Sequence, residues 1–302
     1  MSMALMRFET FLLTEKRVSK NTFDAYKRDI KQLITFLHIT HKAVVESCTA
    51  EQVKSFLYHL KELNLSARTM ARKISSLKVF FSYTSKYLGT KNHATDLHFP
   101  KIDKKLPRYL SELELKKLFQ VAELDTTDIG VRNKVMLFLL YVSGMRITEL
   151  TTLTISQVHF DSKVLAVAGK GGKGRHIPIP DSILDLLKKY ITDVLHKFLD
   201  GGKKHNKGNY LFPVYYGGKM KPISRQSFWF ILKELWEKTG SDKVISPHQL
   251  RHSLATHMLK NGADLRSLQL LLGHENLSTV QIYTHLDTNY LREVYDKKHS
   301  RS

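Results

Sequence analysis

Apolar residues in the first hundred positions recur three or four residues apart and predict four helices. In the last of these helices Met70, Ile74, Leu77 and Phe81 form one stripe, which is the spacing of a buried helix face. Serine and threonine stand at the expected helix starts, and Gly89 is well suited to follow a helix C-terminus. The predicted helices are Met3–Glu15, Ser19 to about Leu37, Thr49 to about Leu63 with a Thr49–Gln52 capping box, and Ser66–Gly89.

A segment with two prolines, five basic residues and no clear periodicity, Lys91–Arg108, is typical of an interdomain linker. Beyond it, Ser111 and Glu114 form a capping box, and the apolar run Val135–Val142, closed by Ser143-Gly144, indicates a buried helix. Strands are predicted at Gln157–Phe160, Val164–Ala168 and Arg175–Ile179, the last two joined by the glycine-rich tip 169–174. Further helices are predicted at Ser182–Leu199, Ser224–Lys238, Pro247–Lys260, Asp264–Leu272, Ser278–Tyr283 and Asn289–Lys297, with a basic, mobile loop at Gly201–Asn209.

The composition is that of a soluble globular protein, with 42% hydrophobic and 10% aromatic residues. No apolar run approaches the roughly 20 residues that span a bilayer, and Met1–Lys20 lacks the apolar core of a signal peptide. The only cysteine is Cys48, which rules out an internal disulfide and favours the reducing cytoplasm. Nothing near Cys48 resembles an activating base, so a catalytic thiol is not expected.

The net charge of +20 is spread over the whole chain. Residues 1–105 carry 19 basic and 9 acidic side chains and residues 106–302 carry 29 and 19, so each part is +10. Two basic bodies favour a polyanion held between them, most simply duplex DNA. A basic, ribosome-associated protein stays open as an alternative on charge alone. Binding to a membrane surface is not expected, because the basic residues are scattered rather than gathered on one helix.

Four pieces of the second half carry candidate chemistry, and their order is informative. They are Ser143-Gly-Met-Arg146-Ile-Thr-Glu149, the hairpin Lys170, His248-Gln-Leu-Arg251-His252, and Leu271-Leu-Gly-His274 with Tyr283 nine residues later. This order resembles the tyrosine recombinase (phage integrase) family, whose pattern is Arg, hairpin Lys, His-x-x-Arg, His or Trp, then Tyr. The stretch Pro247–His285, the linker "FPKIDKKLPRYLS" and the tail "LREVYDKKHS" resemble its Xer branch, the bacterial chromosome-dimer-resolution recombinases.

The resemblance implies a mainly α fold with a small β-sheet, built as a DNA clamp. Residues 1–105 would form a four-helix, SAM-like core-DNA-binding domain with a basic linker at about 91–108, and residues 106–302 an α/β catalytic domain. The C-terminal helix near Asn289–Lys297 would dock on a neighbouring protomer. The implied partners are a double-stranded recombination site, a homo- or heterotetramer with a homologous recombinase, and a DNA translocase; no cofactor or metal is implied.

The chemistry of such a site follows from its residue types. A tyrosine oxygen, from Tyr283, conserves the energy of a broken phosphodiester as a 3′-phosphotyrosyl ester, which a 5′-hydroxyl can attack to exchange strands through a Holliday junction. Guanidinium groups of Arg146 and Arg251 fit non-bridging oxygens bidentately and need no metal ion. The ammonium of Lys170 can protonate the leaving oxygen, and His248 can act on the tyrosine proton. The two remaining roles are a phosphate hydrogen bond from His274 and orientation of an arginine by Glu149.

Taken singly, each residue also has a structural interpretation. Arg146 suits a surface arginine at a helix edge, Lys170 a solvated turn lysine, and Tyr283 a half-buried core aromatic, with Tyr290 and Tyr295 as competing tyrosines. DNA-backbone contacts are predicted for Arg68, Arg72 and Lys73 on the fourth helix, which could equally be a solvated face, and for Lys173 and Arg175.

Other chemistries fit the sequence less well. His248 and His252, four apart on one helix face and with His257 close by, could suggest zinc, but there is no His-Glu-x-x-His motif and no cysteine or acid placed as a third ligand. The Gly169–Gly174 tip lacks the frame of a phosphate-binding loop. A mobile-element integrase, a type IB topoisomerase and a non-catalytic DNA-binding protein on the same scaffold remain alternatives. The Xer-like N-terminal half and the short length argue against the topoisomerase, and the complete residue set argues against the non-catalytic protein. The chain begins directly with the four-helix domain, which favours a resolution recombinase over a phage integrase.

Overall fold

The computed structural model describes residues 2–102, 109–168, 174–200 and 209–273. The chain divides into two compact units, Met1–Lys105 and Leu106–Ser302, which are described in turn. Four predicted segments lie wholly or mostly outside the described residues. They are the helices at Ser278–Tyr283 and Asn289–Lys297, the glycine-rich tip 169–174 except its last residue, and the Gly201–Asn209 loop except its last residue.

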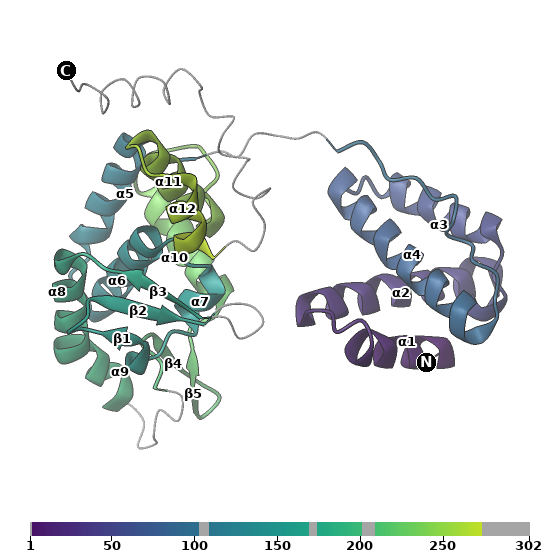
Figure 1. Ribbon diagram of the computed structural model, residues 1–302, viewed down its shortest axis with the longest axis horizontal. Coiled ribbons are helices and arrows are strands. Elements are labelled where there is room, and N and C mark those ends of the chain that lie inside the picture. The colour runs from purple at the N-terminus through teal and green to yellow at the C-terminus, as the bar shows by residue number, and fades with distance from the viewer. Residues whose placement is uncertain (1, 103–108, 169–173, 201–208, 274–302) are drawn as a thin grey trace. The chain divides into compact units, whose positions relative to one another are not determined.

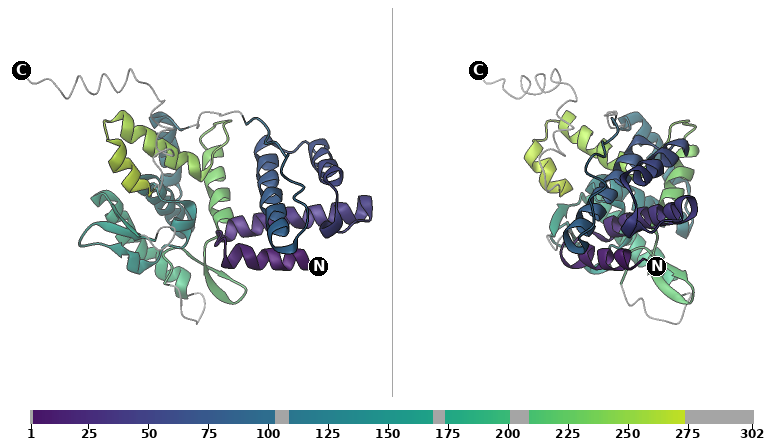
Figure 2. Two further views of the ribbon diagram at one scale, coloured as in Figure 1. Left: turned by 45° about the vertical axis from the view of Figure 1, so that its right-hand side comes forward. Right: turned by 90° about the vertical axis from the view of Figure 1, so that its right-hand side faces the viewer.

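The N-terminal unit is a bundle of four helices around one apolar core. The helices are α1 (Met3–Thr14), α2 (Lys20–His41), α3 (Ala50–Glu62) and α4 (Ala67–Leu88), and α1 and α2 lie side by side (Figures 1 and 2). The predicted stripe of α4 is confirmed, since Ile74, Leu77 and Phe81 are buried and Met70 packs against the same core. All four helices were therefore predictable from the spacing of their apolar residues.

Local capping explains why these helices start and stop where they do. Ser19 and Ser66 each accept a hydrogen bond from the backbone N–H three residues on, and Thr49 with Gln52 forms the predicted capping box. Gly89 takes a left-handed conformation with φ of 66°, a geometry that costs glycine little.

The first half of the predicted linker belongs to the N-terminal core rather than to a free connection. Ala94 and Leu97 are only 1% and 5% exposed and pack among the residues of α1–α4. The absence of periodicity was interpreted as a linker, but two isolated apolar side chains are enough to fix an irregular segment to a core.

The second unit is built around α6 (Asp128–Ser143), which packs against α5 (Glu112–Leu124), α8 (Asp181–Lys189) and α11 (Pro247–Lys260). The predicted buried run is confirmed, since five of the residues 135–142 are fully buried. Ser111 and Glu114 form the predicted capping box of α5. A π-helical turn, Tyr190–Leu195, connects α8 to α9 (His196–Asp200), where the sequence predicted one continuous helix.

Three antiparallel strands form the predicted small sheet, in the order β1-β2-β3. They are β1 (Val158–His159), β2 (Val164–Val167) and β3 (Arg175–Pro178), with Leu165 opposite Ile177 and both buried against the core around α6. A second hairpin, β4 (Pro213–Tyr216) and β5 (Lys219–Pro222), was not predicted. Its signal was present in Gly217-Gly218, which both take the positive φ that a tight hairpin turn requires.

The remaining helices are α7 (Ile147–Thr151), α10 (Arg225–Glu237) and α12 (Leu265–Leu272). The helix α11 has the bounds that the sequence predicted, and α12 packs against α11 and approaches β3 (Figure 1). In the described part of the chain, no helix is long and apolar enough to span a membrane.

Candidate active site

The end of α6 and the start of α7 place Arg146. Gly144 caps α6 in a left-handed conformation, and an added Cβ there would lie 2.7 Å from Leu254 Cδ2 and 2.8 Å from Leu272 Cδ2. Met145 is buried, which anchors the turn, and Arg146 follows as the residue before the first turn of α7. The side chain of Arg146 is 40% exposed, so it is available to a ligand.

Glu149 is the carboxylate that holds this turn. Its Oε2 accepts from the Arg146 backbone N–H at 2.8 Å, and its Oε1 accepts from Arg146 Nη1 at 2.9 Å. From the other side, Arg175 Nη2 donates to Oε2 at 2.8 Å and Nη1 to Oε1 at 3.3 Å. Burial raises the pKa of Glu149, but the bonds from Arg175 and Arg146 outweigh it, so the net pKa lies below the ordinary glutamate value.

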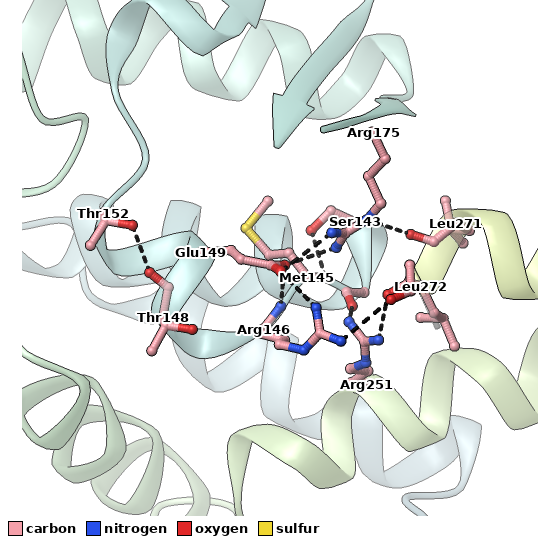
Figure 3. A network of polar contacts seen from close by, with 12 residues as sticks. Ser143, Met145, Arg146, Thr148, Glu149, Thr152, Arg175, Arg251, Leu271 and Leu272 are labelled. Carbon is pink, nitrogen blue, oxygen red and sulfur yellow. Dashed lines mark hydrogen bonds and ion pairs between the residues drawn. The ribbon is translucent and has the colours of Figure 1, made fainter. Parts of the chain in front are cut away.

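Arg251 reaches the same place from α11. It is 6% exposed, and it donates from Nη1 to the Gly144 carbonyl and from Nη2 to the Leu272 carbonyl at 2.6 Å. Figure 3 shows the Arg146 and Arg251 side chains turned toward one another, with Arg175 approaching Glu149 from the opposite side.

Three guanidinium groups therefore meet the C-terminal end of α12. Arg175 Nε bonds the Leu271 carbonyl at 2.9 Å, Arg251 bonds that of Leu272, and Arg146 Nη2 bonds that of Gly273 at 3.4 Å. The last carbonyls of a helix have no intrahelical partners and carry the negative end of its dipole, so cations are favourable there. Three guanidinium charges against the one carboxylate of Glu149 leave an excess of two positive charges, which suits a phosphate.

The histidines of α11 differ in exposure. His248 is exposed in the first turn, whereas His252 is partly buried. Burial, together with the charges of His248 and Arg251, lowers the pKa of His252, which favours its neutral form. His257 is buried with Nδ1 3.0 Å from the Tyr141 hydroxyl. Among the described residues, no three His, Cys, Asp or Glu side chains are placed to hold a metal ion.

Four predicted site residues, Lys170, Lys173, His274 and Tyr283, lie outside the described residues. Of the predicted residues that are described, the structure brings Arg146, Glu149, Arg175 and Arg251 together around one helix end.

The burial of Cys48 raises the pKa of its thiol to about 11, so it is not a thiolate at neutral pH.

Two of the residues predicted to contact DNA are enclosed by the protein, contrary to the exposure that was expected of them. Arg175 was expected on the DNA backbone, but its side chain is 11% exposed and is bonded to Glu149 and Leu271. Lys73 was expected on an outer face, but it is 6% exposed, and its Nζ donates to Asp29 Oδ1 at 3.0 Å and to Gln32. The prediction assumed that charged residues are exposed. Lys73 is instead buried, because it pairs with Asp29, which lies 44 residues away along the chain.

The other two candidates on α4 differ from Lys73. Arg72 is ion-paired with Asp29 yet has 37% of its side chain exposed, and Arg68 is exposed. Both therefore remain candidates for phosphate contact. The role of Arg175 in the site had no signal in the sequence, because it depends on how β3, α7 and α12 meet.

The chain matches two family models. Residues 108–290 match the model described as phage integrase family, and residues 5–86 match the one described as phage integrase, N-terminal SAM-like domain. Among curated relatives, the chain is 38% identical over 302 residues to tyrosine recombinase XerD of Oceanobacillus iheyensis, covering 99% of each chain. It is 36% identical over 294 residues to tyrosine recombinase XerD of Staphylococcus aureus, covering 97% of each.

Solved structures show the same fold. A crystal structure of XerA recombinase is 27% identical, with a TM-score of 0.52 and coverage of 99% of this chain and 98% of that one. A XerH site-specific recombinase bound to a palindromic difH substrate, in a post-cleavage complex, is 21% identical with a TM-score of 0.72, over 97% of this chain and 84% of that one.

Proposed function

Because this chain belongs to the phage integrase family, as a tyrosine recombinase, we propose that it exchanges DNA strands through a covalent 3′-phosphotyrosyl bond to Tyr283. Its target would be a specific site in duplex DNA, and its task the resolution of chromosome dimers at segregation. Attack by the free 5′-hydroxyl of a partner strand on this bond would complete the exchange through a Holliday junction.

One observation supports the proposal most strongly: Arg146 and Arg251, from elements 105 residues apart in sequence, converge on the Gly273 end of α12. In-line displacement at phosphorus spreads negative charge over the non-bridging oxygens. Two fixed guanidinium groups match that charge, and loss of one such preorganised donor costs about 10²–10³ in rate in other enzymes. Tyr283 follows Gly273 by ten residues, so the chain that leaves this helix end leads to the proposed nucleophile.

The other roles complete a balanced reaction. The Tyr283 hydroxyl would lose its proton to His248 as its oxygen bonds phosphorus, and Lys170 would give a proton to the departing 5′-oxygen. His274 would donate a hydrogen bond to the phosphate. Helix α11 carries both His248, which is exposed in its first turn, and Arg251 one turn later. This placement supports these roles.

We further propose that both units bind the duplex. Each carries a charge of +10, and Arg68 and Arg72 on α4 are available for phosphates. Lys173 would also contact the backbone. Four protomers, of this chain alone or with a homologous recombinase, would act together, the C-terminal helix near Asn289–Lys297 docking on a neighbour and a DNA translocase regulating the assembly.

The decisive experiment traps the covalent intermediate. A binding site is first selected from a randomised duplex library and is then remade with a nick close to the cleavage position, so that the cut strand cannot religate. Wild-type protein should form an adduct that survives denaturation, and Tyr283→Phe should form none. Tyr215→Phe, which alters an exposed tyrosine of β4, is the matched control and should react normally.

The alternatives give different results in the same assay. A non-catalytic DNA-binding protein would bind the selected site without an adduct, and this outcome would contradict the proposal. A topoisomerase would form the adduct but would relax a supercoiled plasmid without joining strands of two duplexes. Junction formation between two labelled duplexes therefore distinguishes strand exchange from simple religation, and a salt titration with a log–log slope near −0.9 per phosphate contact measures the contacts.

A further inference from the structure

All three guanidinium nitrogens of Arg175 donate hydrogen bonds within the protein. Nε bonds the Leu271 carbonyl, while Nη1 and Nη2 both bond the Glu149 carboxylate. Its side chain is 11% exposed, against 40% for Arg146 on the other side of the same carboxylate. The two arginines therefore differ in kind: the Arg146 side chain is partly exposed to solvent, and the Arg175 side chain is enclosed behind Glu149.

The charges explain why an enclosed arginine is needed. Glu149 fixes the turn before α7, but its negative charge also opposes the positive charge that Arg146 offers to a phosphate. Arg175 supplies a second cation to the same carboxylate, so Glu149 does not neutralise the charge of Arg146 by itself. Without Arg175, the buried carboxylate would have Arg146 as the one guanidinium bonded to it among the described residues, and it would compete directly with the phosphate.

Packing points to the same role. An added Cβ at Gly273 would lie 3.1 Å from Arg175 Cδ and Nη1, so the Arg175 side chain lies directly against the last turn of α12. Arg175 is the first residue of β3, and it thereby connects the sheet, α7 and the end of α12. A shift of any one of these elements would move the carbonyls that Arg146 and Arg251 contact.

We propose that Arg175 is a positioning residue for strand cleavage, which neutralises Glu149 and holds the end of α12 so that Arg146 stays available to the scissile phosphate. The inference rests on the proposed function, in which Arg146 contacts that phosphate. Arg175 itself touches neither the DNA nor the reacting atoms.

The test separates cleavage from binding. Arg175→Gln is compared with wild type for the rate of adduct formation on the nicked site at saturating DNA, and for affinity for the intact site. We expect the rate to fall about 10- to 100-fold, as when the groups that orient metal ligands are removed from other proteins, with affinity and salt slope unchanged. Arg266→Gln removes an exposed arginine from α12 and should leave the cleavage rate unchanged.

A second substitution distinguishes charge from bulk structure. In Arg175→Gln/Glu149→Gln the uncompensated carboxylate is gone, so cleavage should recover about tenfold over Arg175→Gln alone. A purely structural role predicts the opposite, because the double variant lacks one more set of hydrogen bonds. Arg175→Lys keeps the charge and should fall between wild type and Arg175→Gln; it replaces Arg175→Gln if that variant does not fold.

The outcomes are distinct. Weaker DNA binding with a normal rate at saturation would make Arg175 a DNA contact and overturn the inference, as would a double variant no faster than Arg175→Gln. Absence of any adduct from the wild-type protein would instead contradict the proposed function, and the inference would fail with it.

Discussion

The buried ion pair in the N-terminal unit gives a sharp test of the structure. Asp29 is 1% exposed, and it accepts from Lys73 Nζ at 3.0 Å, from the Ser76 hydroxyl at 3.2 Å and from Arg72. Asp29→Asn keeps the shape and removes the negative charge. The buried ammonium of Lys73 then loses its ion pair and keeps only neutral acceptors among the described side chains, the amide oxygens of Gln32 and of the substituted residue.

The cost of that change can be worked out. Breaking a buried ion pair by removing one partner costs about 3–5 kcal/mol, because the remaining charge stays desolvated. We expect the lower end, about 3 kcal/mol, since Gln32 still accepts from Lys73 and the partly exposed Arg72 can turn to water. A unit of this size has a free energy of unfolding of about 5–15 kcal/mol, so the loss is large.

The chain carries its own reporter for the measurement. Both tryptophans, Trp229 and Trp236, lie in residues 106–302, so their fluorescence follows the second unit, whereas far-ultraviolet circular dichroism follows both. In urea, where the slope is about 1–3 kcal/mol per molar, a loss of about 3 kcal/mol in Asp29→Asn should lower the midpoint of the N-terminal transition by about 1–3 M. The tryptophan transition should not move.

Two further variants complete this test. Asp24→Asn alters an exposed aspartate of the same helix and should leave both midpoints in place. Lys73→Met leaves Asp29 with Arg72 and Ser76, so it should cost less than Asp29→Asn, and combining the two should recover part of the loss. If Asp29→Asn behaves like Asp24→Asn, the pair is solvated and the reasoning is refuted.

Two other predictions concern the candidate active site, and tryptophan-monitored urea unfolding measures both. Gly144→Ala should destabilise the second unit by about 2–4 kcal/mol, because the backbone is left-handed there and the added Cβ would crowd Leu254 and Leu272. Gly217→Ala is the control, since it has the same backbone strain but no atom within 4 Å of the added Cβ. An equal loss in Gly217→Ala would contradict the crowding at Gly144. Folding lowers the pKa of Glu149, so its contribution to the free energy of unfolding is fully present above the ordinary glutamate pKa of about 4.3. That contribution is lost as pH falls through the folded value. The difference in stability between wild type and Glu149→Gln should therefore be largest at pH 7 and shrink in acid. A difference that is constant with pH would show that the carboxylate charge is not what stabilises.

Much of the fold could be predicted because its signals are local. Helix α11 has the predicted bounds, and the Thr49–Gln52 and Ser111–Glu114 capping boxes mark the starts of α3 and α5, since each involves residues three apart. The short helix α7 and the hairpin β4–β5 were missed because five or four residues are too few for a period to show.

The candidate site was likewise predictable only in part. Arg146 and Arg251 could be identified from the order of short motifs, which the chain carries in sequence. Their convergence on Gly273, and the enclosure of Arg175 behind Glu149, could not be identified, because both depend on contacts between residues 26 to 127 positions apart.

The sequence by itself determined most of the helices with their caps, the small sheet, the basic charge of both parts and the residue types of the candidate site. Only the tertiary structure decided which charges are buried and which face outward. The physical reason is that spacing and capping act between near neighbours in the chain. The environment of a charge such as Lys73 or Arg175 is instead set by partners that folding brings from distant elements.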